Sequence, residues 1–266
     1  MPADDLFALV EDLRAPYGLE KSVKFAPGAM IDDRCLVSVH RSALGSSPAE
    51  RLADIADKLG MPADFSAKIA SALEGADIVH FGHEAGPRST VKKIYFEYAE
   101  HARRAMARGE PALVHLAFKW TPGLPGVAAT QYTWSPSRTG AEAESKLRAL
   151  LPTATAPRAL RGALSLLARV AALAETGDLL MMEVEEPGLP RRSCDLNVYD
   201  AGLRVRDVDD LIEAVAKDFA VPSSRRLAVF GGAGDRALGH LSAGVGRDGE
   251  EFVTFYYGIE AHGPRR

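Results

Sequence analysis

The sequence predicts an α/β fold in which ten strands form an antiparallel barrel and the helices lie on its outside. Five pairs of strand-like segments follow one another along the 266 residues, and one or two helices precede each pair. Most of these strands also alternate an apolar side with a polar side, as strands do when one face packs against helices. Ten strands of this kind close most economically into a barrel, with the helices covering the apolar face.

Helices in the first half are indicated by apolar side chains at intervals of three to four residues and by cap residues. Ser47, followed by Pro48 and Glu50, provides an N-cap, a proline in the first turn and an early acidic residue. Alternating residues bounded by Gly and Pro turns indicate the strands. In chain order we expect a helix at 2–14, strands at 23–25 and 35–40, helices at 47–59 and 63–73, strands at 78–84 and 90–98, a helix at 99–108, and strands at 113–120 and 129–134.

The second half repeats this order. The break between two helices has the same chemistry three times, at Met61-Pro62, Leu151-Pro152 and Val221-Pro222, and such similarity indicates a repeat architecture. Because no linker or charge shift divides the chain, we expect one barrel domain over residues 1–266, with about five helix–hairpin repeats. The remaining elements are expected as helices at 141–150 and 157–174, strands at 179–185 and 193–199, a helix at 206–219, a shorter helix after Pro222, and strands at 237–245 and 252–257.

Composition excludes some functions. The formal net charge is −4, which argues against a nucleic-acid partner, because phosphate contacts require a basic surface. Cys35 and Cys194 lack the spacing of a metal or redox motif, so we interpret both as small buried hydrophobic residues. We find no signal-peptide pattern and no apolar run of the roughly 18 residues that a membrane span needs. A cytoplasmic protein without a membrane span is therefore expected.

Polar residues on the predicted strands form a definite set. If the apolar side faces the helices, alternation turns the other side toward the inside of the barrel. An interior packed only for stability would be apolar, because an unpaired buried polar group costs on the order of 1–3 kcal/mol. The alternative is that the set is the solvated surface of an open sheet. The inward set comprises Ser38, His40, His80, Glu84, Lys93, Tyr95, Glu97, His115, Lys119, Glu183, Asp195, Asn197, Tyr199, His240, Ser242, Thr254 and Tyr256, with either Gln131 and Thr133 or Tyr132 and Trp134.

Three of the second strands share a polar-x-Tyr step, at Lys93-x-Tyr95, Asn197-x-Tyr199 and Thr254-x-Tyr256. With these steps and its five helix–hairpin units, the chain resembles the aromatic prenyltransferases of the ABBA fold, named for repeated α-β-β-α units around a ten-stranded antiparallel barrel. The resemblance implies an enzyme of secondary metabolism. It would be a transferase that attaches an isoprenoid, taken from an allylic diphosphate, to an aromatic or electron-rich small molecule in the lumen of the barrel.

The resemblance also implies roles for individual residues. Lysines would bind the diphosphate, because cations in a dry site stabilise a departing anion. Tyrosine ring faces would shield the carbocation, at about 0.5–2 kcal/mol each. A carboxylate would take the proton of the acceptor. On this basis Lys93 and Lys119 bind the diphosphate, Tyr95, Tyr199 and Tyr256 form the shield, Glu84 or Glu97 is the base, and His80, His115, Asn197 and His240 complete the substrate-binding set.

The sequence departs from the family where Asn197 and Thr254 replace the further lysines or arginines that are usual there. Arg41, Arg88, Arg192 or a bound Mg²⁺ would have to supply the missing positive charge. The zinc-protease motif His-Glu-x-x-His is absent and no metal site is predicted, although inward histidines with Glu84 or Asp195 would be one alternative. Two other functions stay open. One is an enzyme that uses His and Glu as acid and base on a polar metabolite, and the other is a non-catalytic barrel that binds a small molecule.

Overall fold

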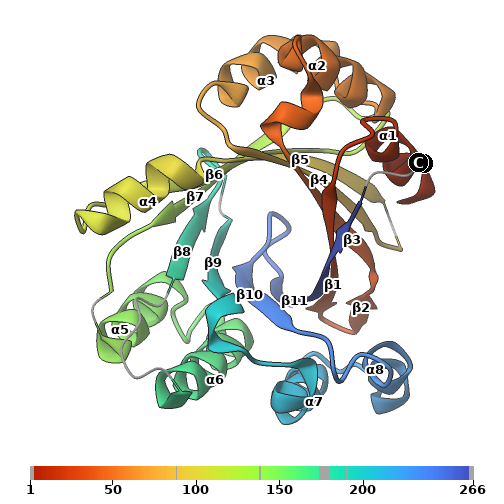
Figure 1. Ribbon diagram of the computed structural model, residues 1–266. Coiled ribbons are helices and arrows are strands. Elements are labelled where there is room, and N and C mark those ends of the chain that lie inside the picture. The colour runs from red at the N-terminus through yellow and green to blue at the C-terminus, as the bar shows by residue number, and fades with distance from the viewer. Residues whose placement is uncertain (1–2, 88, 138, 174–179, 190, 264–266) are drawn as a thin grey trace. The chain divides into compact units, whose positions relative to one another are not determined.

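The computed structural model describes residues 3–87, 89–137, 139–173, 180–189 and 191–263 (Figure 1). The strands are β1 (Tyr17–Ala26), β2 (Ala29–Ile31), β3 (Asp33–His40), β4 (Ile78–Ala85), β5 (Thr90–Glu97), β6 (Ala112–Trp120), β7 (Ala128–Trp134), β8 (Leu180–Glu185), β9 (Arg192–Asn197), β10 (Leu238–Val245) and β11 (Glu251–His262). The α-helices are α1 (Ala3–Glu11), α2 (Pro48–Lys58), α3 (Ser66–Leu73), α4 (Ala99–Ala107), α5 (Gly140–Leu150), α6 (Pro157–Leu173), α7 (Asp209–Asp218) and α8 (Ser223–Phe230). Short 3-10 helices are η1 (Arg41–Leu44), η2 (Ala63–Phe65), η3 (Tyr199–Ala201) and η4 (Val205–Val208).

The strands hydrogen-bond in the order β11-β10-β9-β8-β7-β6-β5-β4-β3-β1-β2, and β11 also pairs with β1. The paired strands therefore form a closed ring. The three-residue β2 stands outside this ring beside β1, and the other ten strands of the described chain make the predicted antiparallel barrel. The largest differences from the prediction are at the starts of two strands, because β1 begins at Tyr17 rather than at residue 23 and β3 begins at Asp33 rather than at residue 35. Leu179, the predicted first residue of another strand, lies outside the described residues.

The chain falls into two compact units. Unit 1 comprises residues 1–21, 33–132 and 260–266, and unit 2 comprises residues 22–32 and 133–259. Among the described helices, none combines the length and the apolar character that crossing a membrane requires.

The core of unit 1 lies between its helices and one face of its strands. Val37, Phe81, Ile94 and Phe96 are fully buried there, and side chains of α1, α2 and α3 join them in one hydrophobic cluster. Figure 1 shows α2 and α3 on one side of β4 and β5. Burial of each such side chain stabilises the fold by roughly 1.5–3 kcal/mol. This face of the strands therefore packs against the helices, and the polar side chains lie on the opposite face.

Unit 2 has the same plan. Its cluster joins one face of β8–β11 to helices α5–α8, with Leu196, Leu241, Val253 and Phe255 fully buried. Because these residues alternate with Asp195, Ser242 and Thr254 along their strands, the polar residues lie on the face away from the helices. The prediction that the apolar side faces the helices is correct in both units.

The two cysteines form no disulfide. Cys194 is fully buried, and burial raises the pKa of its thiol to about 12. Cys35 is half-buried, and burial together with the neighbouring Asp33 raises its pKa to about 11. Both thiols are therefore poor nucleophiles at neutral pH.

Lys92 is an exception to the apolar packing in unit 1. It alternates with Lys93 and so lies on the helix-facing side of β5, where it is 0% exposed and its Nζ lies 3.0 Å from Nδ1 of His83. Burial lowers the pKa of the Lys92 ammonium, against the attraction of Cys35, Asp5 and Asp33, which raises it. A depressed pKa means that folding releases a proton from this lysine when the pH lies between the lowered pKa of the folded state and the pKa of the unfolded state.

We expect the Lys92→Met variant to be more stable than the wild type at pH 7. Burying the charged ammonium of Lys92 costs free energy of folding, and this cost is fully present below the lowered pKa of the folded state. It fades as the pH approaches the unfolded-state pKa near about 10.4, because the unfolded lysine then also loses its proton. Urea unfolding at several pH values between 7 and 10 measures this. The advantage should shrink as the pH rises, and Lys217→Met, at an exposed position of α7, should show no such trend. An advantage that stays constant with pH would contradict the assignment.

Candidate functional site

The polar face of unit 1 is built from β3, β4, β5, β6 and the first part of β7. Antiparallel register places His80 opposite Tyr95, Lys93 opposite Lys119 and Glu97 opposite His115. Directly opposed side chains have Cβ atoms about 4.5–5.5 Å apart, so residues distant in sequence become neighbours here. Most of the residues predicted from this part of the chain therefore share one site.

His80 links two other residues of this face. Its Nδ1 lies 2.6 Å from Ser38 Oγ, and its Nε2 lies 2.8 Å from Glu97 Oε2. A carboxylate only accepts hydrogen bonds, so Nε2–H donates to Glu97, and in the neutral ring Nδ1 accepts from the Ser38 hydroxyl. Burial raises the pKa of Glu97, but the hydrogen bond from His80 and the charges of His80 and His115 outweigh it, and the pKa ends below its ordinary value. Glu97 is thus held as a carboxylate in contact with an imidazole.

Lys119 lies against two tyrosine rings. Its Nζ is 5.8 Å from the ring centroid of Tyr95 and 5.5 Å from that of Tyr132, and it donates a hydrogen bond of 3.3 Å to the Tyr132 hydroxyl. The two ring centroids are 5.9 Å apart. Of the alternatives left open for this strand, the structure places Tyr132 on the polar face.

A cluster of cations surrounds Glu84. Its Oε2 lies 2.5 Å from Lys93 Nζ and 2.5 Å from Arg34 Nη1, and Arg34 is only 7% exposed. Gly82 lies opposite Lys93, and a Cβ atom at Gly82 would come within 3.1 Å of Lys93 Cβ, so glycine leaves room for the lysine stem.

Arg34 was not among the predicted site residues. The predicted strand began one residue later, at Cys35, and so Arg34 fell outside it. Arg34 continues the two-residue alternation of Ser38 and His40 on β3, and this spacing could have identified it.

Unit 2 has a polar face of its own. Register places Asn197 opposite His240 and His240 opposite Tyr256. Asp195 lies 2.9 Å from His240 Nδ1, and the rings of His240 and Tyr256 stack with centroids 3.7 Å apart. Asp195, Asn197, His240 and Tyr256 therefore form one group, as the alternation predicts.

Two residues of unit 2 differ from the prediction. Tyr199 does not end a strand, because β9 stops at Asn197 and Tyr199 begins the short helix η3, where it is 36% exposed and its ring centroid is 6.1 Å from that of His240. Glu183 does not share the face of Asp195. It pairs with the buried Cys194, and Met182 takes the place beside Asp195.

Arg41 and Arg192, which could have supplied extra positive charge, do not lie on the polar faces of the strands. Arg41 begins the 3-10 helix η1 after β3 ends, and Arg192 is exposed at the start of β9. Arg88 lies outside the described residues.

Comparison with known proteins finds likeness in structure alone. No protein-family model matches the chain, and no curated protein matches its sequence. The solved structure of the NotF prenyltransferase superposes with a TM-score of 0.57 at 13% sequence identity, covering 90% of this chain and 80% of that chain. AnaPT from Neosartorya fischeri gives 0.55 at 10% identity, over 90% of this chain and 77% of that chain. A 6-dimethylallyl tryptophan synthase gives 0.54 at 11% identity, over 93% and 83%.

This chain has the ABBA prenyltransferase fold. The three solved structures are aromatic prenyltransferases of that fold, and the likeness extends over nearly the whole chain. Within the ABBA fold of this chain, the polar face of unit 1 carries lysines, an arginine, tyrosines and a histidine-bound carboxylate. This group of residues, called the unit 1 site below, comprises Arg34, Ser38, His80, Glu84, Lys93, Tyr95, Glu97, His115, Lys119 and Tyr132.

Proposed function

We propose that this chain is an enzyme that transfers a prenyl group from an allylic diphosphate to an aromatic or electron-rich small molecule. The fold supports this, and so does NotF, whose structure has been determined in complex with brevianamide F and DMSPP. One observation carries the proposal within this chain. The Lys119 ammonium lies against the faces of Tyr95 and Tyr132, so the unit 1 site combines a cation for the diphosphate with ring faces that stabilise positive charge.

The diphosphate would be bound by Lys93, Lys119 and Arg34. The sequence alone offers two of these cations, and Arg34 adds a third, while the carboxylates of Glu84 and Glu97 offset two positive charges. The surplus of positive charge in a mostly buried site favours an anionic leaving group. Mg²⁺ bound to the diphosphate would add to this charge.

The chemical step would break the bond between the allylic carbon and the diphosphate oxygen, and the electron pair would leave with the diphosphate. Tyr95 and Tyr132 would stabilise the allylic cation, which accepts an electron pair from the acceptor ring. The ring then loses a proton. Glu97 is the proposed acceptor of that proton, because its carboxylate stays ionised and His80 orients it. In unit 2, Tyr199 and Tyr256 remain predicted members of the carbocation shield, and Asn197 and His240 remain predicted substrate-binding residues.

A second candidate has its own support. The chain of hydrogen bonds Ser38–His80–Glu97 resembles an acid–base relay, in which a carboxylate orients an imidazole that in turn contacts a hydroxyl. Such a relay would suit proton transfer on a polar metabolite without any diphosphate.

The two candidates differ in what they bind. With a non-hydrolysable allylic thiodiphosphate, prenyl transfer predicts a rise in the thermal unfolding midpoint, and Lys93→Ala should abolish the rise while Lys217→Ala retains it. With the hydrolysable donor and a panel of indole and phenol acceptors, mass spectrometry should show a product heavier by one prenyl group. No shift with any allylic diphosphate, with or without Mg²⁺, would reject the proposal in favour of the second candidate. A shift without any product would instead favour a non-catalytic binding barrel.

A further inference from the structure

We propose that His80, Glu97 and His115 bind one divalent transition-metal ion, with Zn²⁺ as the reference case. This inference goes beyond the proposed function, because it depends on three side chains and not on a prenyl donor.

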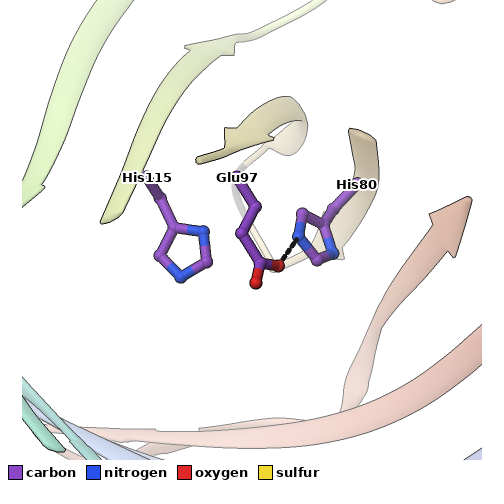
Figure 2. Close-up of side chains that lie close together, drawn as sticks. All are labelled: His80, Glu97 and His115. Atoms are coloured by element: carbon purple, nitrogen blue, oxygen red, sulfur yellow. Dashed lines mark hydrogen bonds and ion pairs between the residues drawn. The ribbon is translucent and has the colours of Figure 1, made fainter. Parts of the chain in front are cut away.

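The three side chains are neighbours on three adjacent strands. His80 lies on β4, Glu97 on β5 and His115 on β6, and one donor atom from each lies within 4.8 Å of the others. Figure 2 shows the Glu97 carboxylate between the two imidazole rings, with the contact to His80 marked. Zinc bonds to nitrogen and oxygen are about 2.0–2.2 Å long, so donors around one tetrahedral ion are roughly 3.3–3.6 Å apart. Small rotations of these side chains would close the remaining distance.

The donor set indicates the kind of metal. Two imidazoles and one carboxylate are ligands of catalytic zinc and of non-haem iron, and such sites keep further coordination positions open. Mg²⁺ prefers an octahedron of oxygen atoms, and two of these three donors are nitrogen. The site therefore favours a transition metal over Mg²⁺.

Ser38 suits the role of a supporting residue. A histidine that binds a metal through one ring nitrogen usually makes a hydrogen bond with the other, which fixes the tautomer and the ring orientation. Here Nδ1 of His80 meets Ser38 Oγ at 2.6 Å, and Nε2 points to Glu97. A hydroxyl both donates and accepts, so Ser38 can support the ring when Nε2 loses its proton to make room for a metal.

Aromatic rings lie beside both histidines. Tyr95 meets the His80 ring at a centroid distance of 6.3 Å, and Tyr132 meets the His115 ring at 5.6 Å, both in edge arrangements. The two imidazole rings therefore pack against tyrosine rings. A bound metal would occupy the oxygen atoms of Glu97 and remove this carboxylate as a proton acceptor, so prenyl transfer through Glu97 would require the metal-free form.

The test measures binding of Co²⁺ and Zn²⁺ to chelator-treated protein without an affinity tag and in the absence of any prenyl donor. We expect one equivalent of Zn²⁺ by equilibrium dialysis with elemental analysis, and a visible absorption band with Co²⁺ that Zn²⁺ displaces. Glu97→Gln and His115→Ala should each lose stoichiometric binding. Ser38→Ala should weaken binding by roughly 10-fold, the lower end of the range for supporting residues.

Controls separate this site from general binding to histidine. His101→Ala, at an exposed position of α4, and His240→Ala, in unit 2, should bind one equivalent as the wild type does. Circular dichroism and the unfolding midpoint without metal show whether each variant is folded, and Glu97→Gln preserves the shape of the side chain. Less than a tenth of an equivalent bound to the wild type, or unchanged binding in folded Glu97→Gln and His115→Ala, would overturn the proposal. Because no donor is present, either result leaves the proposal of prenyl transfer untouched.

Discussion

The Lys119→Met variant should lose prenyl transfer by at least about 100-fold in kcat/KM. Methionine preserves the length and the packing of the side chain but removes the ammonium that would neutralise the departing diphosphate. Loss of one preorganised charge-stabilising group costs about 10²–10³ in rate. The loss should appear also as weaker binding of a non-hydrolysable allylic thiodiphosphate, measured by isothermal titration calorimetry.

Lys119→Arg is the matched variant, because it retains the positive charge and contact with the tyrosine rings. It should keep a larger part of the activity than Lys119→Met. Lys217→Met controls for the loss of one positive charge elsewhere on the chain. Wild-type kinetics in Lys119→Met would show that the diphosphate is bound by other residues.

The Glu97→Gln variant should be slower in prenyl transfer by about 10²–10⁴-fold, the range for loss of a general base. Glutamine retains the shape of the side chain and one oxygen that can accept the hydrogen bond from His80, but it cannot take a proton from the acceptor ring. Binding of the allylic thiodiphosphate should stay close to that of the wild type, because Lys93, Lys119 and Arg34 are unchanged. Rates of product formation and calorimetric binding, both in buffer with a chelator, separate these two effects.

Glu213→Gln, at an exposed position of α7, is the control for a neutralised carboxylate and should react at the wild-type rate. If Glu97→Gln is fully active, Glu97 is not the base. If it fails to bind the donor analogue, Glu97 acts in binding or folding instead.

The alternation of polar and apolar residues along each strand predicts most of the site residues correctly as members of the polar face. On β5 the side chains of Lys93, Tyr95 and Glu97 are polar, and Ile94 and Phe96 are apolar, so the helix-facing side follows from the sequence. The same reasoning is correct for β4, β6, β9, β10 and β11. The ring of ten strands follows from the repeated order of helices and hairpins.

Register could not be predicted in the same way. Helix α4 separates Glu97 from His115, and only the pairing of β5 with β6 makes them direct neighbours. The sequence therefore suggested Glu84 or Asp195 as carboxylate partners for a histidine metal site, whereas Glu97 lies with His80 and His115 and Glu84 lies with Lys93. Contacts across strands depend on the offset between two segments, which the residues of either segment alone do not encode.

Errors at the ends of strands have a different cause. Tyr199 continues the alternation of Asp195 and Asn197, but the chain leaves the sheet after Asn197, and Gly202 at φ 64° ends the short helix that follows. Arg34 is missed at the start of a strand, because β3 begins earlier than predicted. Periodicity identifies the middle of a strand better than its first and last residues.

The pairing of β11 with β1 joins the last strand of the sheet to the first. Contacts between segments so far apart in sequence raise the contact order of the fold, so this pairing is expected to form late and to slow folding. Until it forms, both strands expose unpaired backbone edges to other chains. Aggregation during refolding should therefore depend on protein concentration, and the most vulnerable species would be one in which the other strands are already paired.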